Sequence, residues 1–114
     1  MIKNANSQLS QYNATDHYHK YICGMVLTDG AKALAEMFEC FWFLDIICSY
    51  HPTLLEHEFQ TWRLVVNEDQ SAFVEGTDGN ENTLIQQKVE YTDFKAREAT
   101  VWVEGLVILL PSEH

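Results

Sequence analysis

Residues 28–50, TDGAKALAEMFECFWFLDIICSY, decide the fold predicted from this sequence. A short oxygen side chain at Thr28 or Asp29 is typical of a helix N-cap, because it accepts a hydrogen bond from a free amide of the first turn. Pro52 ends the pattern, since the residue before a proline is pushed out of helical geometry. The stretch therefore predicts one long helix over about residues 29–50.

The predicted helix is too apolar to lie on the surface of a protein. At about 100° per residue, one stripe begins with polar side chains and ends with apolar ones. In order, this stripe holds Lys32, Glu36, Glu39, Phe43, Ile46 and Tyr50. Coverage by the rest of the chain is one interpretation, and a homodimer or partner surface formed by the last three residues is the other.

The second half of the chain predicts strands. β-Branched and aromatic residues are enriched over residues 59–66, 71–75, 83–91, 100–104 and 106–110, and Asp78-Gly79 is a strong hairpin signal. One helical block followed by consecutive strands indicates an α+β fold, with the helix packed on a four- to five-stranded antiparallel meander sheet over about residues 59–110.

The N-terminal part of the chain is expected to contribute little to this sheet. Residues 1–14 are polar and predict a flexible N-terminus, while residues 15–114 form a single domain. Within that domain, residues 16–27 are aromatic-rich and predict a short helix or an extended arm.

The composition restricts the class of protein. A hydrophobic fraction of 46% fits a globular chain, and no apolar run reaches the roughly 18 residues of a membrane span. The N-terminus is polar and unlike a signal peptide, which favours a cytoplasmic location. The three cysteines, Cys23, Cys40 and Cys48, are then expected to be reduced and buried.

Negative charge is concentrated in the second half of the chain. The formal net charge is −10, and residues 68–81 contain five acids and no base. Such a surface repels phosphate backbones and attracts a basic protein surface, although solubility alone is another explanation. The candidate partner-binding acids are Glu68, Asp69, Glu75, Asp78 and Glu81.

Asp45 is the best single candidate for an unusual carboxylate. On a continuous helix it projects from the same apolar face as Leu34, Phe38 and Trp42, which predicts a buried acid. A buried carboxylate must be paired, hydrogen-bonded or protonated. We favour a structural role over that of an acid or base with a raised pKa.

Motifs for metal binding and catalysis are weak. The spacing of His17, His19 and Cys23 matches no common zinc template, and residues 78–89 fail the pattern of a calcium loop. The sequence has no nucleophile elbow, no glycine-rich phosphate loop and no basic stripe for nucleic acid. We therefore expect no catalytic residues, no metal and no cofactor.

Several short motifs are spread over about residues 12–114. They include Thr28-Asp29-Gly30-Ala31, Trp42-Phe43-Leu44-Asp45, Phe59-Gln60-x-Trp62, Tyr91-Thr92-Asp93-Phe94 and Leu109-Leu110-Pro111-Ser112-Glu113. Together these motifs resemble one family of small bacterial proteins. That family is known only as a domain of unknown function and recurs in plasmid and phage-like contexts. The resemblance implies a bacterial or mobile-element origin and a cytoplasmic setting, and it implies no activity.

The leading functional hypothesis is a small, acidic, non-enzymatic protein that binds a basic protein and neither nucleic acid nor a membrane. In a phage or plasmid setting, this describes an inhibitor of a nucleic-acid-handling host protein, such as an anti-CRISPR. The alternative is a homodimeric small-molecule-binding or enzymatic domain with a pocket around Asp45. Its expected lining is Tyr18, His19, His51 and Trp62.

Overall fold

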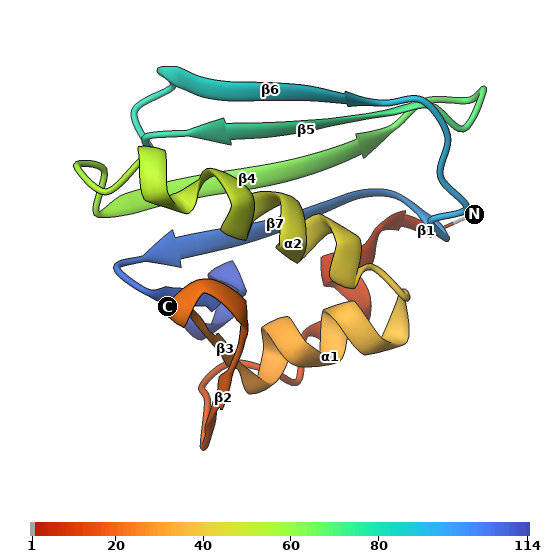
Figure 1. Ribbon diagram of the computed structural model, residues 1–114. Coiled ribbons are helices and arrows are strands. Elements are labelled where there is room, and N and C mark those ends of the chain that lie inside the picture. Colours follow the sequence, from red (N-terminus) through yellow and green to blue (C-terminus); the bar gives the residue numbers. More distant parts are fainter. Residues whose placement is uncertain (1) are drawn as a thin grey trace.

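The computed structural model describes residues 2–114, which form one mixed sheet and two short helices (Figure 1). The helices are α1 (Asp29–Met37) and α2 (Phe41–Tyr50), and four 3-10 turns are η1 (Ala5–Leu9), η2 (Ile22–Gly24), η3 (His51–Thr53) and η4 (Pro111–Glu113). The strands are β1 (Ile2–Asn4), β2 (Tyr18–Lys20), β3 (Val26–Thr28), β4 (Phe59–Val66), β5 (Ala72–Thr77), β6 (Thr83–Val89), β7 (Ala96–Glu104) and β8 (Val107–Leu109).

Seven of the eight strands follow the order β2-β3-β8-β7-β4-β5-β6, and β1 pairs with β7 outside this path. β3 runs parallel to β8 and β1 runs parallel to β7, whereas the other pairs are antiparallel. The α+β class is confirmed. The predicted long helix on a four- to five-stranded antiparallel meander is wrong, because the N-terminal part supplies three strands and the helix is broken.

The helix breaks at Glu39, whose φ of 52° is in the left-handed region. The Cys40 amide donates to the Ala35 carbonyl at 2.9 Å, and the Phe38 amide donates to the Leu34 carbonyl at 3.0 Å. This pattern ends a helix in a Schellman-type motif, where glycine is the usual left-handed residue. The break separates the 9-residue α1 from the 10-residue α2, so the predicted stripe does not continue across it.

Substituting Glu39→Gly is expected to stabilise the protein by about 0.5–1 kcal/mol, because glycine adopts a left-handed conformation without the clash of a Cβ. The melting temperature should rise by about 3 °C in calorimetry. Glu39→Ala keeps the Cβ and should give no such gain. An equal gain from both variants would show that the backbone conformation of Glu39 is not strained.

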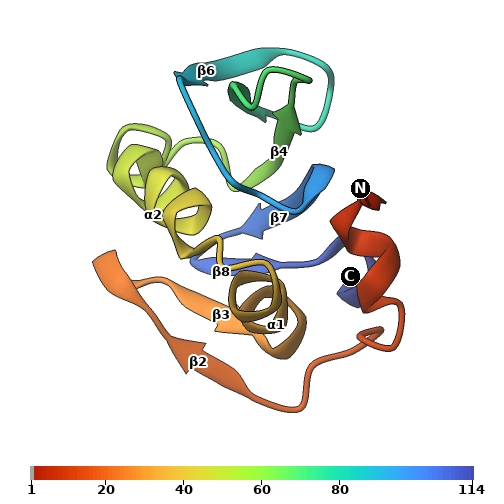
Figure 2. The ribbon, with the colours of Figure 1, turned by 90° about the vertical axis from the view of Figure 1, so that its right-hand side faces the viewer.

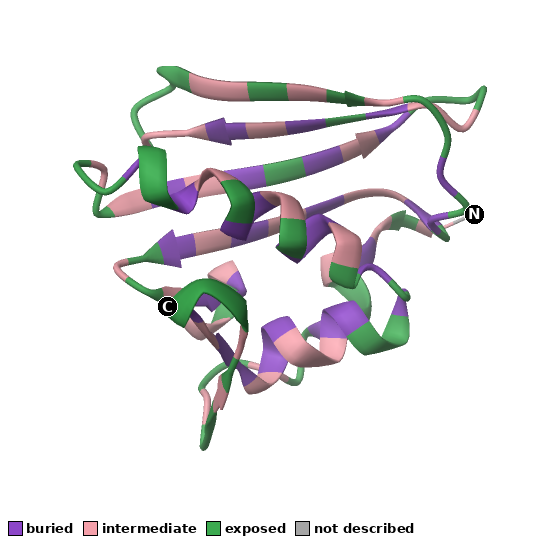
Figure 3. Cartoon of the chain, in the orientation of Figure 1, coloured by how far each residue is buried: buried purple, intermediate pink, exposed green. Residues whose placement is uncertain are grey.

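Alternate residues of the central strands form the core (Figure 3). On β4 the buried side chains are Gln60, Trp62, Leu64 and Val66, and on β7 they include Ala99, Val101 and Val103. Helix α2 crosses these strands and buries Phe43, Leu44, Ile47 and Cys48. Burial of each large apolar side chain contributes about 1.5–3 kcal/mol.

The N-terminal segment, which the sequence predicts to be flexible, forms β1 and η1 and buries Ala5 and Leu9. It lies on the side of β7 away from α2 (Figure 2). The side-chain amide of Asn6 bonds both backbone groups of Thr100, donating to its carbonyl and accepting from its amide, each at 2.8 Å. Asn6 thus continues the pairing of β7 between β1 and β8.

Candidate functional site

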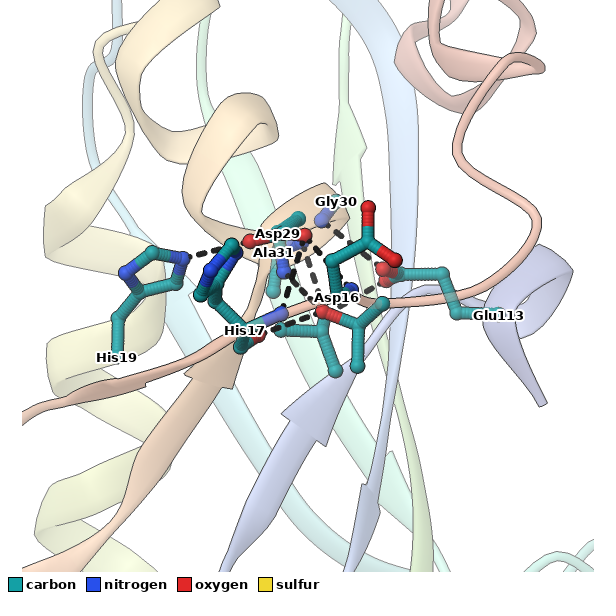
Figure 4. Close-up of polar contacts among 9 residues, drawn as sticks. Asp16, His17, His19, Asp29, Gly30, Ala31 and Glu113 are labelled. Carbon is teal, nitrogen blue, oxygen red and sulfur yellow. Dashed lines mark hydrogen bonds and ion pairs between the residues drawn. The ribbon is translucent and has the colours of Figure 1, made fainter.

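A cluster of polar contacts lies where α1 begins (Figure 4). The Glu113 carboxylate accepts hydrogen bonds from the Thr28 hydroxyl at 2.6 Å, the Gly30 amide at 3.0 Å and the Leu110 amide at 2.9 Å. A carboxylate is stabilised at a helix N-terminus, where free amides and the helix dipole favour negative charge. Glu113 therefore ties residues near the end of the chain to α1.

Asp29 forms the second part of the cluster. Its carboxylate accepts from His19 Nε2 at 2.7 Å and from the amides of Asp16 at 2.9 Å and His17 at 3.4 Å. These hydrogen bonds, that of His19 foremost, lower the pKa of Asp29 to about 2. We call Thr28, Asp29, Gly30 and Glu113 the clasp.

The clasp provides hydrogen-bond partners for the free amides at the start of α1. The Asp29 amide donates to Thr15 Oγ1 at 2.8 Å, and the Ala31 amide donates to Thr28 Oγ1 at 3.2 Å. Together with the Gly30 amide, the first three amides of α1 thus have partners within the protein. The two most widely separated motifs in the sequence meet here, because Thr28-Asp29-Gly30 contacts Glu113.

The lowered pKa of Asp29 predicts an acid-sensitive contribution to stability. This contribution is complete above the ordinary value of 3.8 and is lost as the pH falls through the folded value of about 2. In urea titrations between pH 5 and pH 2, Asp29→Asn should flatten the fall in the free energy of unfolding in this window. A parallel fall in wild type and variant would contradict the assignment.

Asp45 is exposed, so the prediction of a buried acid is wrong. The break at Glu39 changes the rotation of α2 relative to α1, and Asp45 no longer shares a face with Leu34. The Tyr21 hydroxyl donates a hydrogen bond to Asp45 Oδ1. Burial, together with this carboxylate, raises the pKa of Tyr21 above its ordinary value.

The predicted lining residues of an Asp45 pocket occupy different environments. Tyr18 is exposed, His19 bonds Asp29, and Trp62 is fully buried. His51 is also buried, and neither of its ring nitrogens has a hydrogen-bond partner within residues 2–114. These contacts give no support to a shared pocket.

The apolar helix stripe is covered by the chain itself. Phe43 is fully buried, which contradicts its assignment to a partner surface, and Ile46 and Tyr50 are half-buried against the core. Tyr50 stacks on Trp62 and donates from its hydroxyl to Gln87 Oε1 at 2.7 Å. These three residues therefore serve the packing of α2 on the sheet.

The five predicted acids do not form one patch. Glu68 and Asp69 lie in the turn before β5, and Asp78 and Glu81 lie in the turn after it. Glu75 lies between them, on the face of β5 that points away from the helices. The acids are thus distributed along the length of β5.

Two of these acids stabilise turns. Asp69 accepts from the amide of Ser71 at 2.9 Å and from its hydroxyl at 2.6 Å. Asp78 accepts from the Asn80 amide at 2.8 Å and from the side chain of Asn82 at 2.8 Å. These hydrogen bonds lower the pKa of both carboxyls, which remain charged at neutral pH.

Two further acids lie near the five predicted residues. Glu90 and Asp93, which the sequence reasoning missed, follow β6 and are exposed. Residues 67–93, called the acidic region below, hold seven acids and the single base Lys88. None of these acids forms an ion pair within residues 2–114. A charge count over the whole β5–β6 unit would have identified the two added acids.

The remaining candidates for ligands or nucleophiles are the cysteines and histidines. All three cysteines are free thiols, and burial raises the pKa of Cys40 and Cys48 to about 12. Cys23 is exposed, so the expectation of three buried thiols is wrong for it. Within residues 2–114, no three or more histidine, cysteine, aspartate or glutamate side chains are grouped to hold a metal ion.

Comparison with known proteins agrees with the family resemblance seen in the sequence. In the described part of the chain, no helix combines the length and the apolar character needed to cross a membrane. No curated protein and no solved structure matches the chain. A family model does match it over residues 3–114, and the chain therefore belongs to DUF6876, a family of unknown function.

Proposed function

We propose that this chain is a small non-enzymatic binding protein whose partner is a protein with a basic surface. The observation that carries the proposal is the acidic region, with seven carboxylates and one lysine on the two strands β5 and β6 and the connections beside them. Exposed charge of one sign steers an oppositely charged partner and suppresses wrong ones. The same potential opposes direct binding of a phosphate backbone.

A protein that handles nucleic acid is the partner class that we favour. Such proteins carry basic surfaces that bind phosphates, and an acidic protein can occupy those surfaces in their place. We extend the proposal to inhibition of such a host protein in the bacterial cytoplasm, in the manner of an anti-CRISPR.

The test compares two sets of substitutions that change net charge equally. Glu68→Gln, Glu81→Gln and Glu90→Gln remove three of the seven negative charges of the acidic region and keep the turn hydrogen bonds of Asp69 and Asp78. The control neutralises three exposed acids elsewhere, Glu36, Glu56 and Glu58.

The tagged wild type is used to capture proteins from bacterial lysate at low salt, and each captured protein is purified for titration. We expect a basic partner whose affinity falls steeply with salt and at least tenfold in the first variant, with the control variant close to wild type. Equal losses in both variants, or no basic partner at low salt, would overturn the proposal.

A further inference from the structure

The sheet ends in two strands of different length. β2 has three residues, whereas β6 has seven and forms the free edge of the sheet in Figure 1. An edge strand presents unpaired amide and carbonyl groups that another extended chain can bond. β6 is the longer of these two edges, and it lies within the acidic region.

The hydrogen bonds of the hairpins show which backbone groups of β5 point toward β4 and which point toward β6. The Asn67 amide donates to the Ser71 carbonyl at 2.8 Å and closes the turn between β4 and β5. Ser71 thus directs its backbone groups toward β4. Along antiparallel strands this direction alternates from one residue to the next, so the backbone groups of Val74 point toward β6. Gln87 is the partner of Val74 and directs its own backbone groups toward β5.

Gln86 and Lys88 therefore direct their backbone groups away from β5, at the free edge. The other side of β4 gives an independent check of this alternation. The Gly105 amide donates to the Glu58 carbonyl at 2.8 Å, so the backbone groups of Gly105 point toward β4. The same alternation along β7 predicts that the backbone groups of Thr100 point away from β4. A side-chain amide from η1 bonds both of those groups, which agrees with this prediction.

A depression of about 310 Å³ lies beside this edge, on the face of the sheet away from the helices. It is lined by Arg63, Val65, Phe73, Glu75 and Gln86. The Arg63 guanidinium is already engaged at 2.8 Å by a carboxylate of β7, whereas Glu75 accepts only from the Gln86 side chain among the described residues. The depression thus combines a half-exposed aromatic ring with a carboxylate that has no ion pair.

Charge selects the occupant of the edge. Asp78 and Glu81 lie at one end of β6 and Glu90 at the other, where the Thr92 amide donates to the Gln70 carbonyl and holds the β4–β5 turn nearby. A second copy of the chain would bring the same excess of acids against this surface, which disfavours pairing of two β6 strands. An extended basic segment is attracted to both ends.

We propose that β6 binds an extended basic segment of the partner as an added strand of the sheet. Neighbouring strands lie about 4.8 Å apart, so β5 is about 10 Å from the added strand. A lysine or arginine opposite Gln86 spans that gap, with its apolar stem along the Gln86 side chain, beside Phe73, and its cation at Glu75, the residue that pairs with Gln86. Main-chain bonds supply affinity and alternate side chains supply selectivity. This inference rests on the proposed function and names its binding mode.

The probe is a seven-residue peptide of alternating lysine and valine with blocked ends. Its control has the same charge and side chains but is N-methylated on alternate residues, which removes the amides that an added strand donates. We expect the first peptide to bind and the control to bind at least tenfold more weakly. In hydrogen exchange of the complex, the amides of Gln86 and Lys88 should become protected, while that of Gln87 is protected already in the free protein.

Two substitutions at one position test the edge itself. Gln86→Pro removes an outward amide and leaves the bonds between β5 and β6, as edge strands tolerate. Gln86→Ala keeps the amide and removes only the side chain. We expect Gln86→Pro to reduce peptide affinity at least tenfold and Gln86→Ala to remain near wild type, with circular dichroism unchanged for both.

The outcomes separate this inference from the proposed function. Should Gln86→Pro fail to fold, the N-methylated peptide still decides the question. Equal binding of the two peptides, or protection at residues away from β6, would overturn strand addition while leaving the basic partner in place. Absence of binding by either peptide would also overturn it. Only the charge-neutralised variants above test the proposed function.

Discussion

Glu113→Ala should destabilise the protein by about 3 kcal/mol, the loss expected when the clasp opens. Its carboxylate accepts from one hydroxyl and two backbone amides at 2.6–3.0 Å. Hydrogen bonds to a charged group contribute about 1.5–3 kcal/mol each, and the helix dipole adds to them. After truncation, water reaches some of the freed donors, so the expected loss of stability is smaller than the sum of the three hydrogen-bond contributions. The loss is measured as a lower midpoint of urea unfolding, with an unchanged dependence of the free energy of unfolding on urea concentration.

Glu104→Ala is the matched control, because Glu104 is exposed and, among the described residues, its carboxylate pairs only with His114. It should cost less than about 0.5 kcal/mol. Gly30→Ala tests the same contact from the helix side, since a Cβ there would lie 2.5 Å from Glu113 Oε1 and 2.7 Å from Leu110 Cδ1. The double variant should cost less than the sum of Gly30→Ala and Glu113→Ala. Additive losses would show that the clasp does not act as a unit.

Gly76→Ala is expected to destabilise the protein by about 2–3 kcal/mol, although it adds one methyl group. Gly76 on β5 is directly opposite Trp62 on β4, and a Cβ there would lie 2.9 Å from three atoms of the indole ring. Trp62 is fully buried and its indole Nε1 donates to Gln60 Oε1 at 2.9 Å, so the ring has no room to retreat. Overpacking of this kind costs about 1–3 kcal/mol.

A double-mutant cycle distinguishes this clash from an effect on the unfolded chain. In a Trp62→Phe background the smaller ring leaves space, and the cost of Gly76→Ala should fall by at least half. If the alanine costs the same with either ring, crowding against Trp62 is not the cause. Thermal and urea unfolding should give the same ranking of the four proteins.

Local signals in the sequence predicted several elements well. The strand predicted at residues 59–66 is β4, Thr28 is the N-cap of α1, and α2 ends at Tyr50 before Pro52. Each depends on neighbouring residues: a hydroxyl beside a free amide, a ring that excludes helical geometry, or a run of β-branched side chains. Such interactions can be recognised without knowing the rest of the fold.

The remaining errors arise from interactions that the local sequence does not contain. A glutamate at the left-handed position of Glu39 gives no glycine signal, and one missed break misassigned the faces of Phe43 and Asp45. β1 is three residues long and owes its position to β7, with Ile2 paired to Ala96. Residues so far apart leave no periodic pattern.

For the candidate site, the sequence identified the charge but not its arrangement. Five of the seven acids of the acidic region lie in the base-free run of residues 68–81, whereas Glu90 and Asp93 lie beyond Lys88 and outside that run. The free edge of β6 depends on the order of the strands, which composition does not encode. Sequence reasoning could therefore name a class of partner and not a mode of binding.

The pairing of both ends of the chain has a kinetic consequence. β4, β5 and β6 are joined by short turns, whereas β1 pairs with β7 and β3 with β8 across most of the chain. Closing long loops before contacts form slows folding, so the meander should assemble early and the first three strands late. During that interval β6 is formed and its edge is open, so a partly folded molecule already presents the edge at which we propose that the partner binds.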